Sequence, residues 1–303
     1  MASQELQGLL TMFKSRPAPP ADQTLAERRA GFEAMAAGFG PLPGDITVTP
    51  VDAGGVKAEW VAAANADPGT VILYLHGGGY VIGSPASHRD LTQRLSRAAG
   101  ARVLSVDYRM APESPFPAAV EDAVAAYRWL LAQGADPKRM VISGDSAGGG
   151  LTLATLVALR DAGVALPAAA APISPWTDLA MTGESLKTRA HLDPIITPDL
   201  LGSGMAAAYI GSHDARNPLI SPLYADYHGL PPLLIQVGES EVLYDDAARV
   251  AQKAKAAGVD VTFEPWPDMI HVWHLFSAML PEGQQAIERI GQFVRQRTGL
   301  VAV

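Results

Sequence analysis

From residue 46 onward, segments patterned like strands alternate with segments patterned like helices. The strand candidates are ITVTPV (46–51), VKAEWVA (56–62), TVILYLH (70–76), ARVLSVDY (101–108), RMVISG (139–144), AAAAPIS (168–174), PLLIQVG (232–238) and VDVTFEPW (259–266). The first two are separated by DAGG and form a predicted hairpin. Later ones are joined by helical segments such as 88–100, 118–134 and 244–258. This order predicts an α/β fold: an eight-stranded, mostly parallel sheet with helices on both faces.

Two stretches do not follow this alternation. Residues 1–45 carry one candidate amphipathic helix, at 23–39, between proline-rich segments, and residues 177–228 mix Gly, Pro, Asp and His. An irregular insertion of about fifty residues is more often a functional lid than a plain connection. We therefore predict a cap made of 1–45 and 177–228, on a core made of 46–176 and 229–303.

The charge and the cysteine content exclude several classes of function. The 303 residues include 31 acidic and 23 basic side chains, a formal net charge of -8, which disfavours binding to nucleic acid and to anionic membranes. The chain has no cysteine, so disulfides, thiolate metal sites and a cysteine nucleophile are excluded. It shows neither a signal-peptide pattern nor an apolar run long enough to span a bilayer. We expect a cytoplasmic protein with no membrane partner.

The segment GDSAGGG (144–150) carries the strongest chemical signal. Ser146 lies between Gly144 and Gly148, directly after a strand candidate and directly before a helix candidate. A G-x-S-x-G pattern alone is weak evidence, but this strand-turn-helix setting is the one that a nucleophile elbow requires. A phosphate-binding loop would need a following Lys or a G-x-G-x-x-G spacing, and neither is present. Ser146 is the predicted nucleophile.

A second glycine-rich segment, HGGGY (76–80), follows the third strand candidate. Acyl transfer develops negative charge on a carbonyl oxygen, and backbone N–H groups aimed at that oxygen stabilise it. We predict an oxyanion hole formed by Gly77, Gly78 and the N–H of Ala147. An ordinary glycine-rich turn is the alternative, and the nearby elbow disfavours it.

Four motifs, HGGGY, DYRMAPE (107–113), GDSAGGG and DMIHVW (268–273), occur in an order that resembles the bacterial hormone-sensitive-lipase-like esterases. The resemblance runs from about residue 45 to the end, and GDSAG indicates the subgroup with an Asp, here Asp145, before the serine. It implies an α/β-hydrolase fold with a helical cap, and ester hydrolysis by a serine, acid and histidine triad without metal or cofactor. We interpret Asp107, Arg109 and Glu113 as buried polar links that hold the oxyanion loop. A homodimer through the edge of the eighth strand is a further expectation from the family.

The triad order of this fold is serine, acid, histidine, so the base must follow residue 146. His271 lies after the last strand candidate and matches the family's histidine. His274 is expected to be a packing residue. The histidines in or beside the cap segment are expected to be exposed or to pack in the cap: His191, His213 and His228.

The acid is less clear from the sequence. The loop GESEVLYDDA (238–247) departs from the Asp-Pro-Leu of the family, and alignment on the leucine places Glu241 at the Asp. A Glu can orient an imidazole as an Asp does, so Glu241 is the predicted acid of the triad. Asp245 and Asp246 are the alternatives, and both are expected in the first turn of the next helix, where acidic groups suit the helix dipole.

Apolar residues indicate a closed acyl pocket: Met12, Phe13, Tyr80, Met205 and Tyr209. We predict that four residues bind the substrate: Tyr80, Asp145, Met205 and Tyr209. The expected substrates are small molecules, namely short acyl esters. The same triad could instead serve a deacetylase, lactonase or amidase. A non-enzyme alternative is a ligand-binding receptor such as the plant gibberellin receptors, in which the triad histidine is replaced; His271 argues against it.

Overall fold

The computed structural model describes residues 3–15, 20, 22–38 and 40–300. Within these residues, eight strands form one sheet in the order β1-β2-β4-β3-β5-β6-β7-β8. The strands are β1 (Ile46–Asp52), β2 (Lys57–Ala63), β3 (Asp67–Leu75), β4 (Ala101–Val106), β5 (Met140–Asp145), β6 (Ala169–Ile173), β7 (Leu233–Gly238) and β8 (Val261–Trp266). The pairs β1-β2 and β2-β4 are antiparallel, and the remaining pairs are parallel. The predicted sheet is confirmed.

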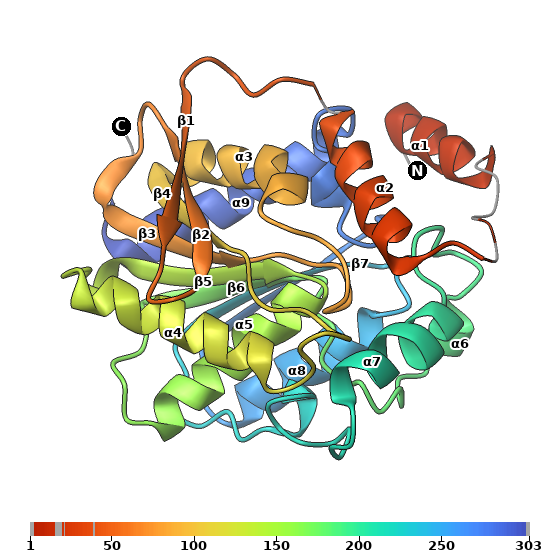
Figure 1. Cartoon of the computed structure of the whole chain (residues 1–303). Coiled ribbons are helices and arrows are strands. Elements are labelled where there is room, and N and C mark those ends of the chain that lie inside the picture. The colour runs from red at the N-terminus through yellow and green to blue at the C-terminus, as the bar shows by residue number, and fades with distance from the viewer. Residues whose placement is uncertain (1–2, 16–19, 21, 39, 301–303) are drawn as a thin grey trace.

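Helices cover both faces of the sheet (Figure 1). On one face, α3 (Arg89–Ala99) and α9 (Pro281–Thr298) share a core with the strands through residues such as Leu95 and Ile290. On the other face lie α4 (Ala118–Ala132), α5 (Ala147–Asp161) and α8 (Tyr244–Ala256). Strands β5, β6 and β7 are buried along their whole length, as expected for a parallel sheet covered on both sides. Gly100, Gly134 and Gly258 follow helices and have a positive φ, as left-handed C-terminal caps do.

The segments outside the alternation lie together at one end of the sheet (Figure 1). They contain α1 (Gln4–Ser15), α2 (Leu25–Ala37), α6 (Ser185–Thr188), a π-helical turn at Leu200–Ala206 and α7 (Ala207–Ile210). The sequence pattern missed α1, whose buried Leu6 and Leu9 pack against Trp273 and Phe276. The cap boundaries remain a prediction.

Short 3-10 turns complete the described elements: Ala86–His88, Pro137–Arg139, Pro222–Tyr224 and Trp273–Phe276. The last of these follows β8 and carries the chain from the predicted base toward α9. Among the helices in the described ranges, none combines the length and the apolar character that a membrane span needs.

Candidate active site

Ser146 lies in the sharp turn between β5 and α5. Its φ is 54°, a region that a non-glycine residue occupies only when the surrounding structure enforces it. The backbone of Ser146 is held on both sides, since its N–H donates to the Ile173 oxygen at 2.9 Å and its oxygen accepts from Trp176 N at 2.9 Å. A Cβ at Gly148 would lie 1.9 Å from the Leu75 oxygen, so this tight turn requires glycine there. The geometry is that of a nucleophile elbow.

The glycine loop, residues 76–80 after β3, differs from the prediction in one respect. Gly77 donates its N–H to Oδ1 of Asp145 at 2.9 Å, so this donor is already engaged. Gly78 and Gly79 line the cavity in front of Ser146, whereas Gly77 does not. The N–H of Ala147 lies in the first turn of α5, where helix N–H groups lack intrahelical acceptors. The predicted donors were Gly77, Gly78 and Ala147; Gly77 is withdrawn because its N–H is engaged, and Gly78, Gly79 and Ala147 are the candidate donors.

Asp145 connects the nucleophile elbow to the glycine loop through hydrogen bonds. Besides Gly77, its Oδ1 accepts from the Tyr74 hydroxyl at 2.7 Å and lies 3.4 Å from Nε2 of His88. Burial would raise the pKa of Asp145, but the charge of His88 and these hydrogen bonds outweigh burial and lower it to about 2. Asp145 therefore remains an anion beside the serine. It also lines the cavity, as predicted for a substrate-binding residue.

The acid and the base meet on the loops that follow β7 and β8. Nδ1 of His271 lies 2.8 Å from Oε2 of Glu241, and both side chains are buried. Burial alone would lower the pKa of His271, but the negative charge of Glu241 and its hydrogen bond outweigh burial and raise it. With Nδ1 bound to Glu241, Nε2 is the nitrogen left to accept a proton from a nucleophile.

Asp245 and Asp246 have other partners. Both lie in the first turn of α8, as predicted. Asp245 Oδ2 accepts from Ser185 N at 2.9 Å, and Asp246 Oδ2 accepts from Thr177 N and Asp178 N at 2.8 Å each. Their carboxylates thus hold the start of the cap segment. Of the three acidic candidates, it is Glu241 whose carboxylate the structure brings to His271.

The other histidines that follow Ser146 in the sequence have the surroundings that the sequence suggested. His274 is buried, bonds through Nε2 to Oε1 of Gln236 at 2.8 Å and packs on the Trp273 ring. Burial lowers the pKa of His274 to about 3, so it stays neutral. The three histidines of the cap segment are exposed: His191, His213 and His228.

A cavity of about 450 Å³ opens onto the elbow and collects side chains from both cap segments. Its polar lining consists of Asp145, Ser146 and His271, and Gly78 and Gly79 of the glycine loop also line it. The rest is apolar: Phe13, Phe32, Met35, Ile82, Pro194, Ile195, Ile196, Leu200, Leu201, Met205, Val272, Leu275 and Phe276. No Lys or Arg occurs among these described lining residues. The cavity therefore suits an uncharged, largely apolar ligand.

Three predicted pocket residues lie elsewhere. Tyr80 and Tyr209 are fully buried and stack on each other, with ring centroids 3.7 Å apart. Neither lines the cavity, so their predicted contact with substrate is corrected: both side chains belong to the hydrophobic core. Met12 is 36% exposed and does not line it either, because it faces away from the core on α1. Phe13 and Met205 do line the cavity, as predicted.

The three charged residues of the DYRMAPE segment, Asp107, Arg109 and Glu113, are exposed, which corrects the expected buried links. Glu113 is exposed and binds Arg29 of α2, with the shorter contact 2.7 Å. Arg29 also donates to the backbone oxygens of Ala111 and of Val81, the residue that follows the glycine loop. Sequence reasoning missed Arg29, because nothing in its local pattern indicates a partner 84 residues away. This contact fixes α2, and with it part of the cavity wall.

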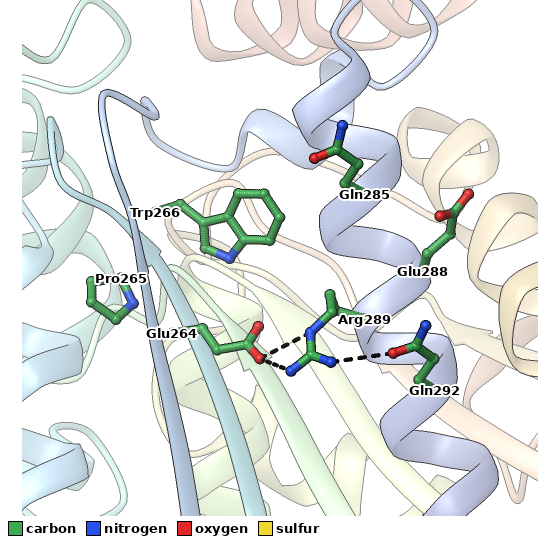
Figure 2. A pocket seen from close by; sticks show the side chains of 7 residues that line it. All are labelled: Glu264, Pro265, Trp266, Gln285, Glu288, Arg289 and Gln292. Atoms are coloured by element: carbon green, nitrogen blue, oxygen red, sulfur yellow. Dashed lines mark hydrogen bonds and ion pairs between the residues drawn. The ribbon is translucent and has the colours of Figure 1, made fainter. Parts of the chain in front are cut away.

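A second hollow, of about 510 Å³, opens between β8 and α9 (Figure 2). Arg289 in this hollow is paired with Glu264 and also bonds Gln292, and Trp266 forms one wall. Its lining holds no nucleophile paired with a base, unlike the cavity at Ser146. Within the described ranges, no three His, Asp or Glu side chains are grouped so that they could hold a metal ion.

Comparison with known proteins extends this description. A family described as alpha/beta hydrolase fold matches residues 72–275. An acetyl-hydrolase of Streptomyces hygroscopicus is 54% identical over 276 residues, which cover 90% of each chain. An esterase structure from the bacterial hormone-sensitive lipase (HSL) family has a TM-score of 0.95 at 52% identity and covers 99% of this chain and 100% of that chain. A crystal structure of EstE5 soaked with p-nitrophenyl butyrate has a TM-score of 0.94 at 51% identity and covers 98% and 100%.

The fold and the site thus define a hydrolase of the α/β-hydrolase fold. Within that fold, the chain belongs to the bacterial hormone-sensitive-lipase-like esterases. It is a carboxylic ester hydrolase. The resemblance inferred from the four motifs is confirmed.

Proposed function

We propose that this protein hydrolyses short-chain acyl esters through a Ser146–His271–Glu241 triad and an acyl-enzyme intermediate. The observation that carries the proposal is the cavity onto which Ser146 and the Glu241-paired His271 both open. A serine becomes a nucleophile when a nearby base takes its proton and a third group orients that base.

In the first half of the reaction, Oγ of Ser146 attacks the ester carbonyl carbon and its proton passes to Nε2 of His271. The carbonyl oxygen becomes an oxyanion, which the N–H groups of Gly78, Gly79 and Ala147 stabilise. Glu241 holds the imidazole in the required tautomer and stabilises its cation. His271 then returns the proton to the leaving alcohol.

In the second half, a water molecule attacks the acyl carbon of the acyl-enzyme. His271 takes a proton from the water, and the collapse of the tetrahedral species returns that proton to Oγ of Ser146. The carboxylic acid leaves, and the free serine is restored. The net reaction converts one ester and one water molecule into one alcohol and one carboxylic acid.

Preference for short acyl groups is supported by the size and the walls of the cavity. At about 450 Å³, it lies near the lower end of the roughly 300–1,000 Å³ common for small-molecule sites. The cavity is lined by Phe13 and Phe32 from the N-terminal helices and by Met205 from the cap segment. An acyl chain that outgrows this space has to displace packed cap residues.

The test is hydrolysis of p-nitrophenyl acetate, butyrate, octanoate and laurate by the wild type and by Ser146→Ala. We expect the highest kcat/KM for acetate or butyrate, a steep fall toward laurate, and no turnover by the folded serine variant. Higher kcat/KM on laurate would overturn the chain-length proposal. Activity retained by Ser146→Ala would overturn the mechanism.

Deacetylation is a second candidate, favoured by the name of the Streptomyces hygroscopicus relative, an acetyl-hydrolase. Acetylated alcohols and acetylated amines, assayed side by side, separate an esterase from an amide-cleaving deacetylase. A lactone added to the same set tests the lactonase alternative.

A homodimer and a cytoplasmic location remain proposals. Strand β8 is the last strand of the sheet and pairs with β7 on one side, which leaves its other edge for a second copy. Sedimentation at micromolar concentration tests the dimer, and cell fractionation tests the location.

A further inference from the structure

Ser174 is a buried serine that neither the motifs nor the proposed mechanism uses. It follows β6 directly and has no exposed surface. Its hydroxyl donates to Oε1 of Glu241 at 2.6 Å, and its oxygen accepts from Val272 N at 3.3 Å. Val272 is the residue after His271. One hydroxyl thus contacts both the carboxylate of the acid and the backbone of the loop that carries the base.

The backbone of Ser174 provides an independent observation. Its φ is 43°, a left-handed value that glycine adopts without cost and serine does not. The Ser174 N–H donates to the Gln236 oxygen at 2.7 Å, which fixes this conformation between β6 and β7. A serine at a position that suits glycine indicates that its side chain is used.

The carboxylate of Glu241 is held by three donors. Oε2 receives the His271 Nδ1–H, while Oε1 receives the Ser174 hydroxyl and the Gly238 N–H, the latter at 2.6 Å. A Glu has one more rotatable bond than an Asp, so a buried Glu needs donors on both oxygens to keep one of them on the imidazole. Gly238 supplies one donor to Oε1 from the backbone, and Ser174 supplies the other from its side chain.

We propose that Ser174 is a positioning residue of the acid–base pair: its hydroxyl fixes the Glu241 carboxylate against His271 and ties it to the loop of the base. The inference rests on the proposed triad. It gives a physical reason why this chain can use Glu where the resemblance predicts Asp.

The role predicts a change in the pH profile. Loss of the Ser174 hydroxyl removes a donor from the Glu241 anion, so protonation of the Glu241–His271 pair becomes more favourable, wherever the proton resides. The acid limb of kcat/KM should then move to higher pH. The other charged groups facing the pair, Asp193 of the cap segment and Asp145 of the elbow, are the same in wild type and variant.

The test compares Ser174→Ala and Ser174→Gly with Ser96→Ala on a p-nitrophenyl ester. Ser96 is a matched control because it is also buried, donates its hydroxyl to the Ala101 oxygen at 2.7 Å and accepts from Ala63 N at 2.9 Å, far from the site. We expect both Ser174 variants to lose about 10- to 100-fold in kcat with KM little changed, and to show the shifted acid limb. Ser96→Ala should lower Tm with wild-type kcat and pH profile.

Glycine suits a φ of 43°, so Ser174→Gly should fold even if Ser174→Ala does not. Wild-type kcat and pH profile in Ser174→Gly would overturn the inference, since only the backbone conformation would then matter. Glu241→Gln, assayed in parallel, separates the two proposals. If Glu241→Gln is inactive and Ser174→Gly is normal, the Ser174 role fails and the triad stands; if Glu241→Gln is fully active, the triad itself fails.

Discussion

Replacement of Glu241 by Gln is the sharpest test of how the base is held. The amide occupies nearly the same volume and can still accept from Nδ1 of His271, but it carries no charge. The amide can also present its NH₂ group to the ring, which favours the wrong imidazole tautomer. The substitution therefore removes electrostatic stabilisation while leaving the buried space filled.

The size of the effect follows from the geometry. With Nδ1 and Oε2 at 2.8 Å, the attraction between an imidazolium and a carboxylate is roughly 6 kcal/mol at an effective dielectric constant of about 20. If the transition state loses about 4 to 5.5 kcal/mol of this electrostatic attraction, kcat falls about 10³- to 10⁴-fold, because about 1.4 kcal/mol corresponds to a factor of ten in rate. That range matches the cost of amide replacement of a triad acid in other serine hydrolases, about 10⁴-fold.

The assay is kcat and kcat/KM on p-nitrophenyl butyrate across pH, with Tm as the folding control. The matched control is Asp245→Asn, whose amide oxygen can still accept from Ser185 N, and which should stay near wild type. The residual activity of Glu241→Gln should have its acid limb at lower pH, because the charge that raises the pKa of His271 is gone. A kcat within tenfold of wild type, or an inactive Asp245→Asn, would refute the reasoning.

Three further outcomes are expected. The wild-type rate should be lost as pH falls through the pKa of His271, because the protonated ring cannot accept the proton of Ser146. The midpoint should lie above the ordinary histidine value of 6.5, and a pH–rate profile with a midpoint below 6.5 would contradict this. His271→Ala should abolish turnover, whereas His274→Ala should lower Tm and keep most activity; the reverse order in the ester assay would mean that the base is wrongly assigned. Removal of residues 1–40 should lower activity and increase binding of an apolar dye, because Leu6 no longer covers its cluster; wild-type kinetics and dye binding would contradict it.

Local sequence predicted the features that depend on local chain geometry. The strand and helix pattern gave the eight strands and the helices that cover the sheet, because each element must present apolar side chains with its own period. The glycines of GDSAGGG placed Ser146 in a tight turn, since no other residue fits that close to the backbone of Leu75. The sequence pattern did not predict α1, because this helix is stabilised by contacts with Trp273 and Phe276, which are distant in sequence.

The tertiary structure decided which polar groups meet. Nothing in HGGGY shows that the N–H of Gly77 is taken by Asp145, because that contact joins residues 68 positions apart. The stacking of Tyr80 on Tyr209 and the ion pair of Arg29 with Glu113 are equally remote in sequence. Hydrogen bonds and ring contacts have short range and strict geometry, so they depend on how the sheet and the cap place their side chains.

The candidate site combines both kinds of information. The sequence by itself determined the nucleophile turn, the loop of the base and a short segment that contains the acid, because each of these follows a strand in a fixed order along the chain. Alignment of the loop favoured Glu241 over Asp245, and only the folded structure shows that Glu241 contacts His271, that Asp245 binds Ser185 N and that Ser174 lies against the Glu241 carboxylate. The physical reason is that the strands set the order of the loops, while the partners of a buried charge depend on which donors from distant loops converge on it.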